Sequence, residues 1–164
     1  MDTPNFTPGQ LNTMRRFFHA MNHFMVFMWK IGMGRMINFW PAVIGRILVI
    51  KHRGRKTGKE YLTPVNYAIV DHEIYSMAGF GSGTDWYRNL LANPEVQLWV
   101  LEGRRCAHAT DVSDSPQRSI LFREISIASG FAAPLFGVDP RKLTDEQMAK
   151  IGKDYRIIHF ELEK

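Results

Sequence analysis

Residues 47–78 read ILVIKHRGRKTGKEYLTPVNYAIVDHEIYSMA, and this stretch decides the fold. Short apolar or β-branched segments alternate in it with turns rich in glycine, aspartate and basic residues. That pattern predicts strands over residues 46–52, 61–70 and 74–78, joined by tight turns. Pro64 lies inside the second strand. It cannot donate to a ladder, so it marks an edge, a bulge or a break that faces a ligand.

The same pattern continues toward the C-terminus. We predict strands over residues 96–101, 104–112 and 155–162. We predict helices from Thr84 or Asp85 to Leu91, over residues 115–129, and from a Thr144/Gln147 capping box to Gly152. Five or six short strands without regular βαβ alternation favour an antiparallel barrel over a doubly wound sheet. Without an internal repeat or a linker, residues 1–164 are expected to form a single domain.

An amphipathic helix is predicted over about residues 8–31, ending near Gly32 or Gly34. Methionine and phenylalanine dominate one face, at helical spacing. We expect this face to pack on the core of the domain or on a dimer partner; a wall for a lipid-like substrate and contact with a membrane surface are the alternatives. His19 and His23 are four residues apart but lack the other ligands of a zinc motif, so no metal site is expected.

Composition narrows the class of protein. The 164 residues are 45% hydrophobic and 23% charged, which is typical of a globular domain. The net charge of +5 fits an anionic ligand, a nucleic acid or an anionic membrane.

Cys106 is the single cysteine, so a reducing compartment is favoured and a cytoplasmic location is expected. We interpret Cys106 as a small core side chain rather than an activated thiolate. No secretory signal and no apolar run of membrane-spanning length is evident.

The first stretch that carries chemistry is the basic turn between Lys51 and Lys59, KHRGRKTGK. Arginine offers a planar fork to phosphate or carboxylate, and glycine lets backbone amides approach an anion. The spacing of Gly54 and Gly58 fails the P-loop pattern. A solvated surface turn is the alternative. Nucleic acid is not the expected partner, because aromatic residues are not interleaved with the basic ones.

The second stretch is GFGSGTDWYRN, from Gly79 to Asn89. It resembles half of a dinucleotide fingerprint, but Thr84 stands where the third glycine belongs, and a βαβ unit is lacking. A Rossmann site is therefore not expected. A glycine loop that opens a helix still presents backbone amides to an anion or a ring carbonyl.

Together, GRKTGK, Thr63-Pro64, the glycine loop and DWYRNLLANPEV closely resemble the deazaflavin-dependent nitroreductase family, most strongly from Ile47 to Val100. The resemblance implies a split β-barrel of about six antiparallel strands. It also implies an oxidoreductase that transfers a hydride from reduced coenzyme F-420 to a small apolar acceptor, quinone-like or nitroaromatic. The implied cofactor-binding residues are Arg55, Lys56, Thr57 and Gly58 for the phosphate and acidic tail, Pro64, Met77, Ala78, Gly79, Phe80 and Gly81 beside the ring, and Trp86 and Asn89 in the helix that closes the site.

One loop departs from the family. The best-known nitroreductases of the family carry tyrosines in the substrate loop. In this chain that loop, residues 130–136, reads GFAAPLF. Phe131 and Phe136 are expected to line the acceptor pocket, and Tyr67 or Tyr155 could supply the missing catalytic hydroxyl. An FMN-dependent enzyme of the same fold and a non-catalytic carrier of an apolar ligand are the alternative functions. Sheet edges and the apolar first helix also make a homodimer an open expectation.

Overall fold

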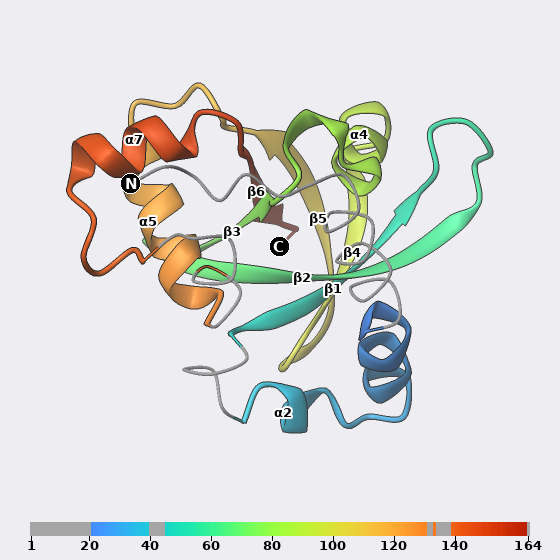
Figure 1. Ribbon diagram of the computed structural model, residues 1–164. Coiled ribbons are helices and arrows are strands. Elements are labelled where there is room, and N and C mark those ends of the chain that lie inside the picture. Colours follow the sequence, from blue (N-terminus) through green and yellow to red (C-terminus); the bar gives the residue numbers. More distant parts are fainter. Residues whose placement is uncertain (1–20, 40–44, 131–132, 134–138, 164) are drawn as a thin grey trace, which may run out of the picture.

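The computed structural model describes residues 21–39, 45–130, 133 and 139–163, and their centre is a closed antiparallel barrel (Figure 1). Around the barrel the strand order is β1-β2-β3-β6-β5-β4. The strands are β1 (Ile47–Arg53), β2 (Glu60–Val70), β3 (Glu73–Ala78), β4 (Glu95–Val100), β5 (Gly103–Asp111) and β6 (Arg156–Leu162). The helices are α2 (Gly34–Ile37), the 3-10 turn η1 (Gly81–Gly83), α4 (Asp85–Ala92), α5 (Arg118–Ala128) and α7 (Asp145–Gly152). The predicted barrel is confirmed.

Alternation along each strand separates the barrel interior from its outer face. The pairing of Leu48 with Val65 and of Ile50 with Leu98 puts alternate residues of neighbouring strands on the inner side. The interior is one apolar cluster, made of Leu48, Ile50, Val65, Tyr67, Ile74, Ala78, Val96, Leu98, Val100, Ala107, Ala109, Ile158 and Phe160, with Tyr87 and Leu90 of α4. Because α4 contributes to this cluster, it forms part of the barrel core rather than a loose surface helix.

Pro64 lies in the part of β2 that is paired on one side. It stands opposite Val49 of β1, whereas β3 pairs with β2 only from Tyr67 onward. Pro64 is therefore at an edge-like position, which is one of the three outcomes its sequence context predicted.

Helices α5 and α7 cover the outer face of β2, β3 and β6 and are seen on the left of Figure 1. Leu121, Phe122 and Ile125 of α5 and Met148 of α7 are almost fully buried there, against Ile157 of β6. Thr144 and Gln147 form the predicted capping box at the start of α7. Helix α5 begins at Arg118, three residues later than expected from Ser115, because 115–117 form a turn that precedes it.

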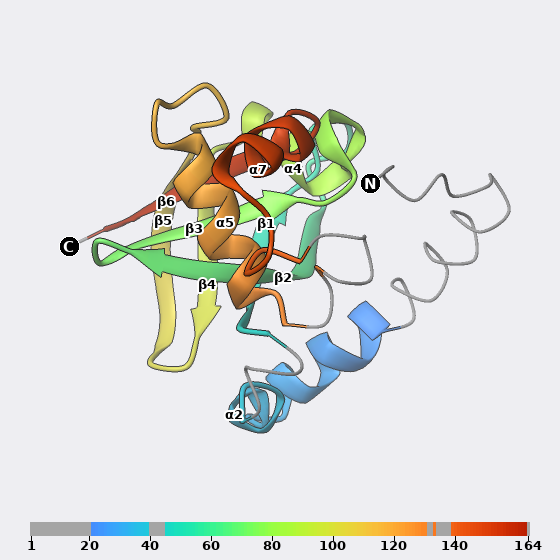
Figure 2. The ribbon, with the colours of Figure 1, turned by 60° about the vertical axis from the view of Figure 1, so that its left-hand side comes forward.

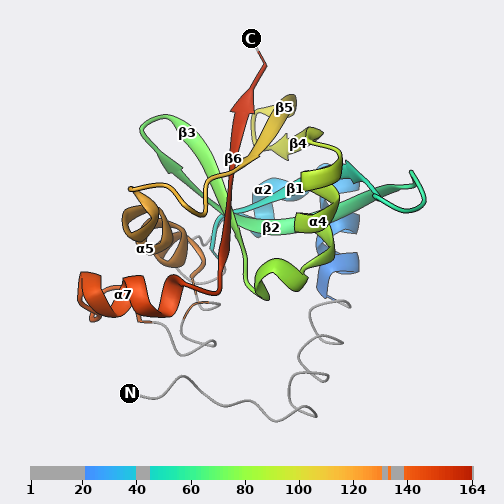
Figure 3. The same cartoon turned by 90° about the horizontal axis from the view of Figure 1, so that it is seen from above.

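Helix α4 lies on a different side, next to the β1–β2 hairpin. Seen from above, the hairpin projects away from the barrel beside α4, opposite α5 and α7 (Figure 3). The antiparallel register from Ile47–Asn66 to Arg53–Glu60 carries this hairpin outward, and α4 contacts both β1 and β5. The basic turn and α4 therefore lie at the same end of the molecule.

The described part of the N-terminal region is helical over residues 21–30, followed by the short helix α2 (Figure 2). Met25 is buried against Ile47 of β1, with Met21, Met28 and Trp29 around them. Packing of this helix on the domain itself is thus confirmed for its described part; residues 8–20 of the predicted helix lie outside it. Helix α2 was not predicted. Within the described residues, no helix is long and apolar enough to cross a membrane.

One local prediction is wrong. Cys106 is exposed, not a core side chain. In β5 the inward positions belong to Ala107 and Ala109, and strand alternation turns Cys106 outward. Thr84 is the N-cap residue of α4 but its side chain does not cap: its hydroxyl is buried and has no hydrogen-bond partner among the described residues.

Candidate cofactor site

The turn between β1 and β2 is folded by its own backbone. The Gly54 amide donates to the carbonyl of Lys59 (2.8 Å), and the Gly58 amide donates to the carbonyl of Gly54 (2.8 Å). Gly58 has φ +66°, in the left-handed region that glycine adopts without strain. The Thr57 hydroxyl accepts from the Lys59 amide (3.3 Å). The predicted glycine positions therefore shape the turn.

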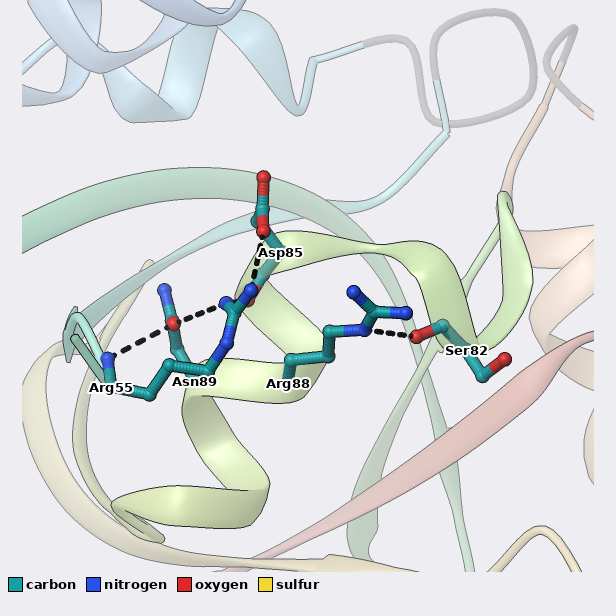
Figure 4. Close-up of polar contacts among 5 residues, drawn as sticks. All are labelled: Arg55, Ser82, Asp85, Arg88 and Asn89. Carbon is teal, nitrogen blue, oxygen red and sulfur yellow. Dashed lines mark hydrogen bonds and ion pairs between the residues drawn. The ribbon is translucent and has the colours of Figure 1, made fainter.

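Arg55 ties this turn to α4 (Figure 4). Its backbone amide and its Nη1 both donate to Oδ1 of Asn89, at 3.1 and 2.9 Å. Its Nη2 donates to Oδ1 of Asp85 at 3.1 Å, as an ion pair. Asn89 is buried, so its two bonds to Arg55 are shielded from water and set the position of the turn against the helix.

Positive charge remains available at the tip of the turn. Lys51 is engaged by Glu60 at 3.0 Å. Lys56 and Lys59, in contrast, are exposed and form no ion pair in the part of the chain that the structure describes. These two ammonium groups, beside the exposed Thr57 hydroxyl, are suited to hold a phosphate or carboxylate.

The glycine loop directly precedes α4, at the helix end that carries Asp85. Gly81 has φ +63°, and a Cβ atom there would be 2.5 Å from the carbonyl oxygen of Asp154, so only glycine fits. A Cβ at Gly79 or Gly83 would meet no atom within 4 Å, so the backbone of the loop borders open space. Nε of Arg88 donates to the carbonyl of Ser82 at 2.7 Å and holds the loop on the helix (Figure 4).

A polar network anchors α4 to the barrel. The hydroxyl of Tyr87 donates to Oδ2 of Asp111 at 2.5 Å, and the backbone amide of Ser113 donates to Oδ1. Burial and the Asp111 carboxylate raise the pKa of Tyr87 to about 12. Burial of Asp111 opposes its ionisation, but the hydrogen bonds from Ser113 and Tyr87 outweigh this and lower its pKa. The Tyr87 hydroxyl is thus a donor throughout the physiological range.

His52 lies at the base of the basic turn and is uncharged at neutral pH. Burial lowers its pKa to about 4. Its Nε2 is 3.0 Å from the Thr63 hydroxyl, and its ring stacks on Tyr61, with 5.8 Å between ring centroids. His52 therefore adds packing to the hairpin but no charge to the anion site.

The structure brings part of the predicted site together. The basic turn, the glycine loop and α4, which carries Trp86 and Asn89, lie at one end of the barrel, where β3 ends at Met77 and Ala78. Trp86 is partly buried against the barrel core. Phe80 lies in the glycine loop, and Pro64 lies midway along β2. The proposed pocket residues Phe131 and Phe136 lie outside the described residues.

The two tyrosines proposed for catalysis lie outside both the basic turn and α4. Tyr67 is inside the barrel toward the end where β1 begins: its amide donates to the carbonyl of Arg46. Burial, with a smaller contribution from Glu102, raises its pKa. Tyr155 packs on Phe122 (ring centroids 5.0 Å apart), and burial together with Asp154 raises its pKa. Of the two, only Tyr155 adjoins the glycine loop, since Asp154 contacts Gly81. Their catalytic role stays a prediction.

Sequence reasoning missed Asp85, Tyr87 and Asp111. Asp85 binds a residue 30 positions earlier in the chain, and Tyr87 one 24 positions later. One sequence feature could have indicated Asp85. It is an acidic residue at the first position of a predicted helix, and that helix and the basic turn both belong to the expected site. No local pattern pointed to the Tyr87–Asp111 bond.

A closed antiparallel barrel with a basic hairpin clamped to a short helix defines a protein of the split-barrel class. Solved structures show the same fold. The chain superposes with a TM-score of 0.51 on a conserved hypothetical protein of Mycobacterium tuberculosis, at 15% identity and 80% coverage of each chain. It also matches a heme binding protein of Mycobacterium smegmatis with a TM-score of 0.50, at 9% identity, covering 74% of this chain and 47% of that one.

Sequence comparison gives the family. A sequence model of the F420H(2)-dependent quinone reductases matches residues 27–132, more than half of the chain. The chain therefore belongs to the F420H(2)-dependent quinone reductase family, a family of oxidoreductases. It is also 34% identical over 79 residues to a Mycobacterium tuberculosis protein named provisionally as an F420H(2)-dependent quinone reductase. That match covers 46% of this chain and 65% of the relative, just under two thirds of its length. The resemblance from the basic turn and the glycine loop is confirmed at the level of the family.

Proposed function

We propose that the protein binds reduced coenzyme F-420 at the hairpin end of the barrel and reduces a quinone-like acceptor. The observation that carries this proposal is the basic turn clamped to α4 by Asn89, with Lys56 and Lys59 free of ion pairs within the described residues. A site of this kind suits a ligand with an anionic tail, and the family of the chain names the cofactor.

The chemistry of the residues fits the cofactor. Its phosphodiester and glutamate groups are anionic and match the two lysines and the Thr57 hydroxyl. Its flat ring needs a surface where backbone can approach closely. The loop around Gly79 and Gly83, which borders open space, offers one. The bound cofactor would supply a hydride; the chain would hold the tail, orient the ring and exclude water.

The acceptor is proposed to be a quinone rather than a nitroaromatic compound. The family name favours a quinone, and the loop at 130–136 reads GFAAPLF, without the tyrosines of the best-known nitroreductases. Tyr155 is the better candidate for a proton donor, because its neighbour Asp154 lies against Gly81 of the glycine loop.

Steady-state oxidation of F-420H2 tests this function. With menadione as the quinone, absorbance of oxidised F-420 should grow with enzyme concentration, and Tyr155→Phe should lower the rate while cofactor affinity is kept. A parallel assay with a nitroimidazole should give slower turnover. Turnover with FMNH2 in place of F-420H2 would move the protein to the FMN alternative. Cofactor binding without turnover of any acceptor would favour the carrier alternative.

Contact with a membrane surface is a second part of the proposal. In the described helical residues 21–30 and the turn after them, Phe24, Phe27 and Ile31 are about half to two-thirds exposed, at i, i+3, i+7 spacing on one face. A different face, with Met25, packs on Ile47 of the barrel. Lys30 and Arg35 are exposed nearby. An exposed apolar stripe with basic neighbours suits an anionic lipid surface, where apolar quinones partition.

Vesicle sedimentation tests this contact. The cytoplasmic protein we propose should sediment with vesicles of anionic lipid but not with neutral ones, and Phe24→Ser/Phe27→Ser should abolish this. If the same variant instead converts a dimer to a monomer in light scattering, the stripe is the interface of a homodimer.

A further inference from the structure

We propose that Asp85 is an internal competitor for the anionic tail of the cofactor: it occupies the guanidinium of Arg55 in the ligand-free protein and is displaced when the tail binds. This inference rests on the proposed function, since it concerns the same site. In this proposal Asp85 lowers the affinity for the cofactor. Nη1 of Arg55 holds the guanidinium in place on Asn89, and Nη2 binds the ligand.

The two ends of the guanidinium are held differently (Figure 4). Nη1 donates to Asn89, which is buried at 7% exposure and also accepts from the Arg55 backbone amide. Nη2 donates to Asp85, whose side chain is 84% exposed. Asn89 therefore fixes where the guanidinium lies, while Asp85 is held only by contacts at the surface.

This difference makes the exchange easy. An ion pair with an exposed partner contributes little to stability, because water solvates the released carboxylate well. A phosphate or carboxylate that reaches Nη2 replaces one charge-assisted hydrogen bond with another and adds the attraction of Lys56 and Lys59. Arg55 keeps its position throughout, since both bonds to Asn89 remain.

Asp85 also loses little when it is released. It is the first residue of α4, where the partial positive charge of the helix N-terminus stabilises a carboxylate. That stabilisation persists after its side chain leaves Arg55. The carboxylate would still lie near the bound anion and repel it, so Asp85 weakens binding both by occupying Nη2 and by its charge.

The test is a fluorescence titration of wild type, Asp85→Asn and Glu60→Gln with oxidised F-420. Glu60→Gln is the matched control: it removes one carboxylate from the same hairpin, but that carboxylate pairs with Lys51 and not with Arg55. Asp85→Asn should bind about fivefold more tightly than wild type, and Glu60→Gln should change affinity by less than about twofold. The deazaflavin riboside that lacks the phosphate and tail should bind all three proteins equally.

Each result decides a different point. Tighter binding confined to Asp85→Asn and to the full cofactor supports the exchange. Equal or weaker binding by Asp85→Asn, or equal tightening in Glu60→Gln, overturns it while the cofactor site stands. If wild type and both variants fail to bind F-420 although their equal thermal unfolding midpoints show that all three are folded, both the proposed function and the exchange are wrong.

Discussion

The α4 side and the α5/α7 side of the barrel are built differently. On the α5/α7 side, Phe122 and Ile125 are within 1% of complete burial, and packing of apolar side chains holds the helices. On the α4 side, the contacts with the basic turn are polar: Arg55 donates to the buried Asn89 and to the exposed Asp85. Apolar packing holds α5 and α7, whereas α4, which also packs on the barrel core, places charge where a ligand can use it. Substitutions on the two sides should therefore have different effects.

The largest effect is expected from Phe122→Ala. Phe122 is 1% exposed and packs on Tyr155. Removing its ring should lower the free energy of unfolding by about 3–5 kcal/mol, because a cavity remains between α5 and α7. Urea unfolding followed by circular dichroism measures this. A loss below about 1 kcal/mol would mean that this side isn't the stabilising one.

The second-largest effect is a loss of stability in acid, which we expect from His52 at the base of the β1–β2 hairpin. Burial holds the pKa of His52 at about 4, below its ordinary 6.5. Between pH 6.5 and pH 4, the His52 imidazole is therefore protonated in the unfolded chain but neutral in the folded protein. The corresponding stability is complete above pH 6.5 and is lost as the pH falls from 6.5 to 4, by on the order of 2–3 kcal/mol. His52→Gln should unfold with a flatter pH dependence over this window. Parallel curves for the two proteins would contradict the assignment.

Asn89→Ala should lower both the free energy of unfolding and the affinity for F-420. It removes the acceptor of two hydrogen bonds from Arg55, so unfolding should become easier by about 1–2 kcal/mol. Because the turn is then no longer fixed on α4, affinity for F-420 should fall about tenfold or more. Calorimetric binding and urea unfolding on the same preparation separate the two losses. Unchanged affinity would show that the clamp has no part in binding.

The smallest effect is expected from Glu60→Gln. The Lys51–Glu60 pair is at the surface, with side chains 36% and 57% exposed. Its loss should change the free energy of unfolding by less than about 1 kcal/mol, because solvent screens the pair. A larger loss would indicate that the hairpin depends on this ion pair and not on its backbone turn.

Much of the fold could be predicted from local sequence. Short apolar or β-branched segments bounded by turns predict the strands, and the strand boundaries agree to within one residue. The capping box of α7 was predicted correctly because its two partners are three residues apart. Cys106 was predicted wrongly: it lies beside Ala107 in β5, and the hydrophobicity of a single residue does not say which face of a strand is buried.

The site was predictable in part. Arg55 and Asn89 entered through a resemblance between short motifs, and the structure brings them within hydrogen-bond distance. Asp85 and the Tyr87–Asp111 bond were missed, since partners 24–30 residues apart become neighbours only when the barrel closes. Local patterns cannot give such contacts; only the topology of the fold does.

The central claim is that the basic turn binds the anionic tail of coenzyme F-420. The most direct measurement is a fluorescence titration of wild type, Lys56→Ala and Lys150→Ala with oxidised F-420. Lys150 is the matched control, an exposed lysine on α7, away from the turn. Saturable binding that weakens about tenfold in Lys56→Ala and less than about twofold in Lys150→Ala is the predicted result. Absence of binding by the folded wild type, or equal affinity in Lys56→Ala, would contradict the claim.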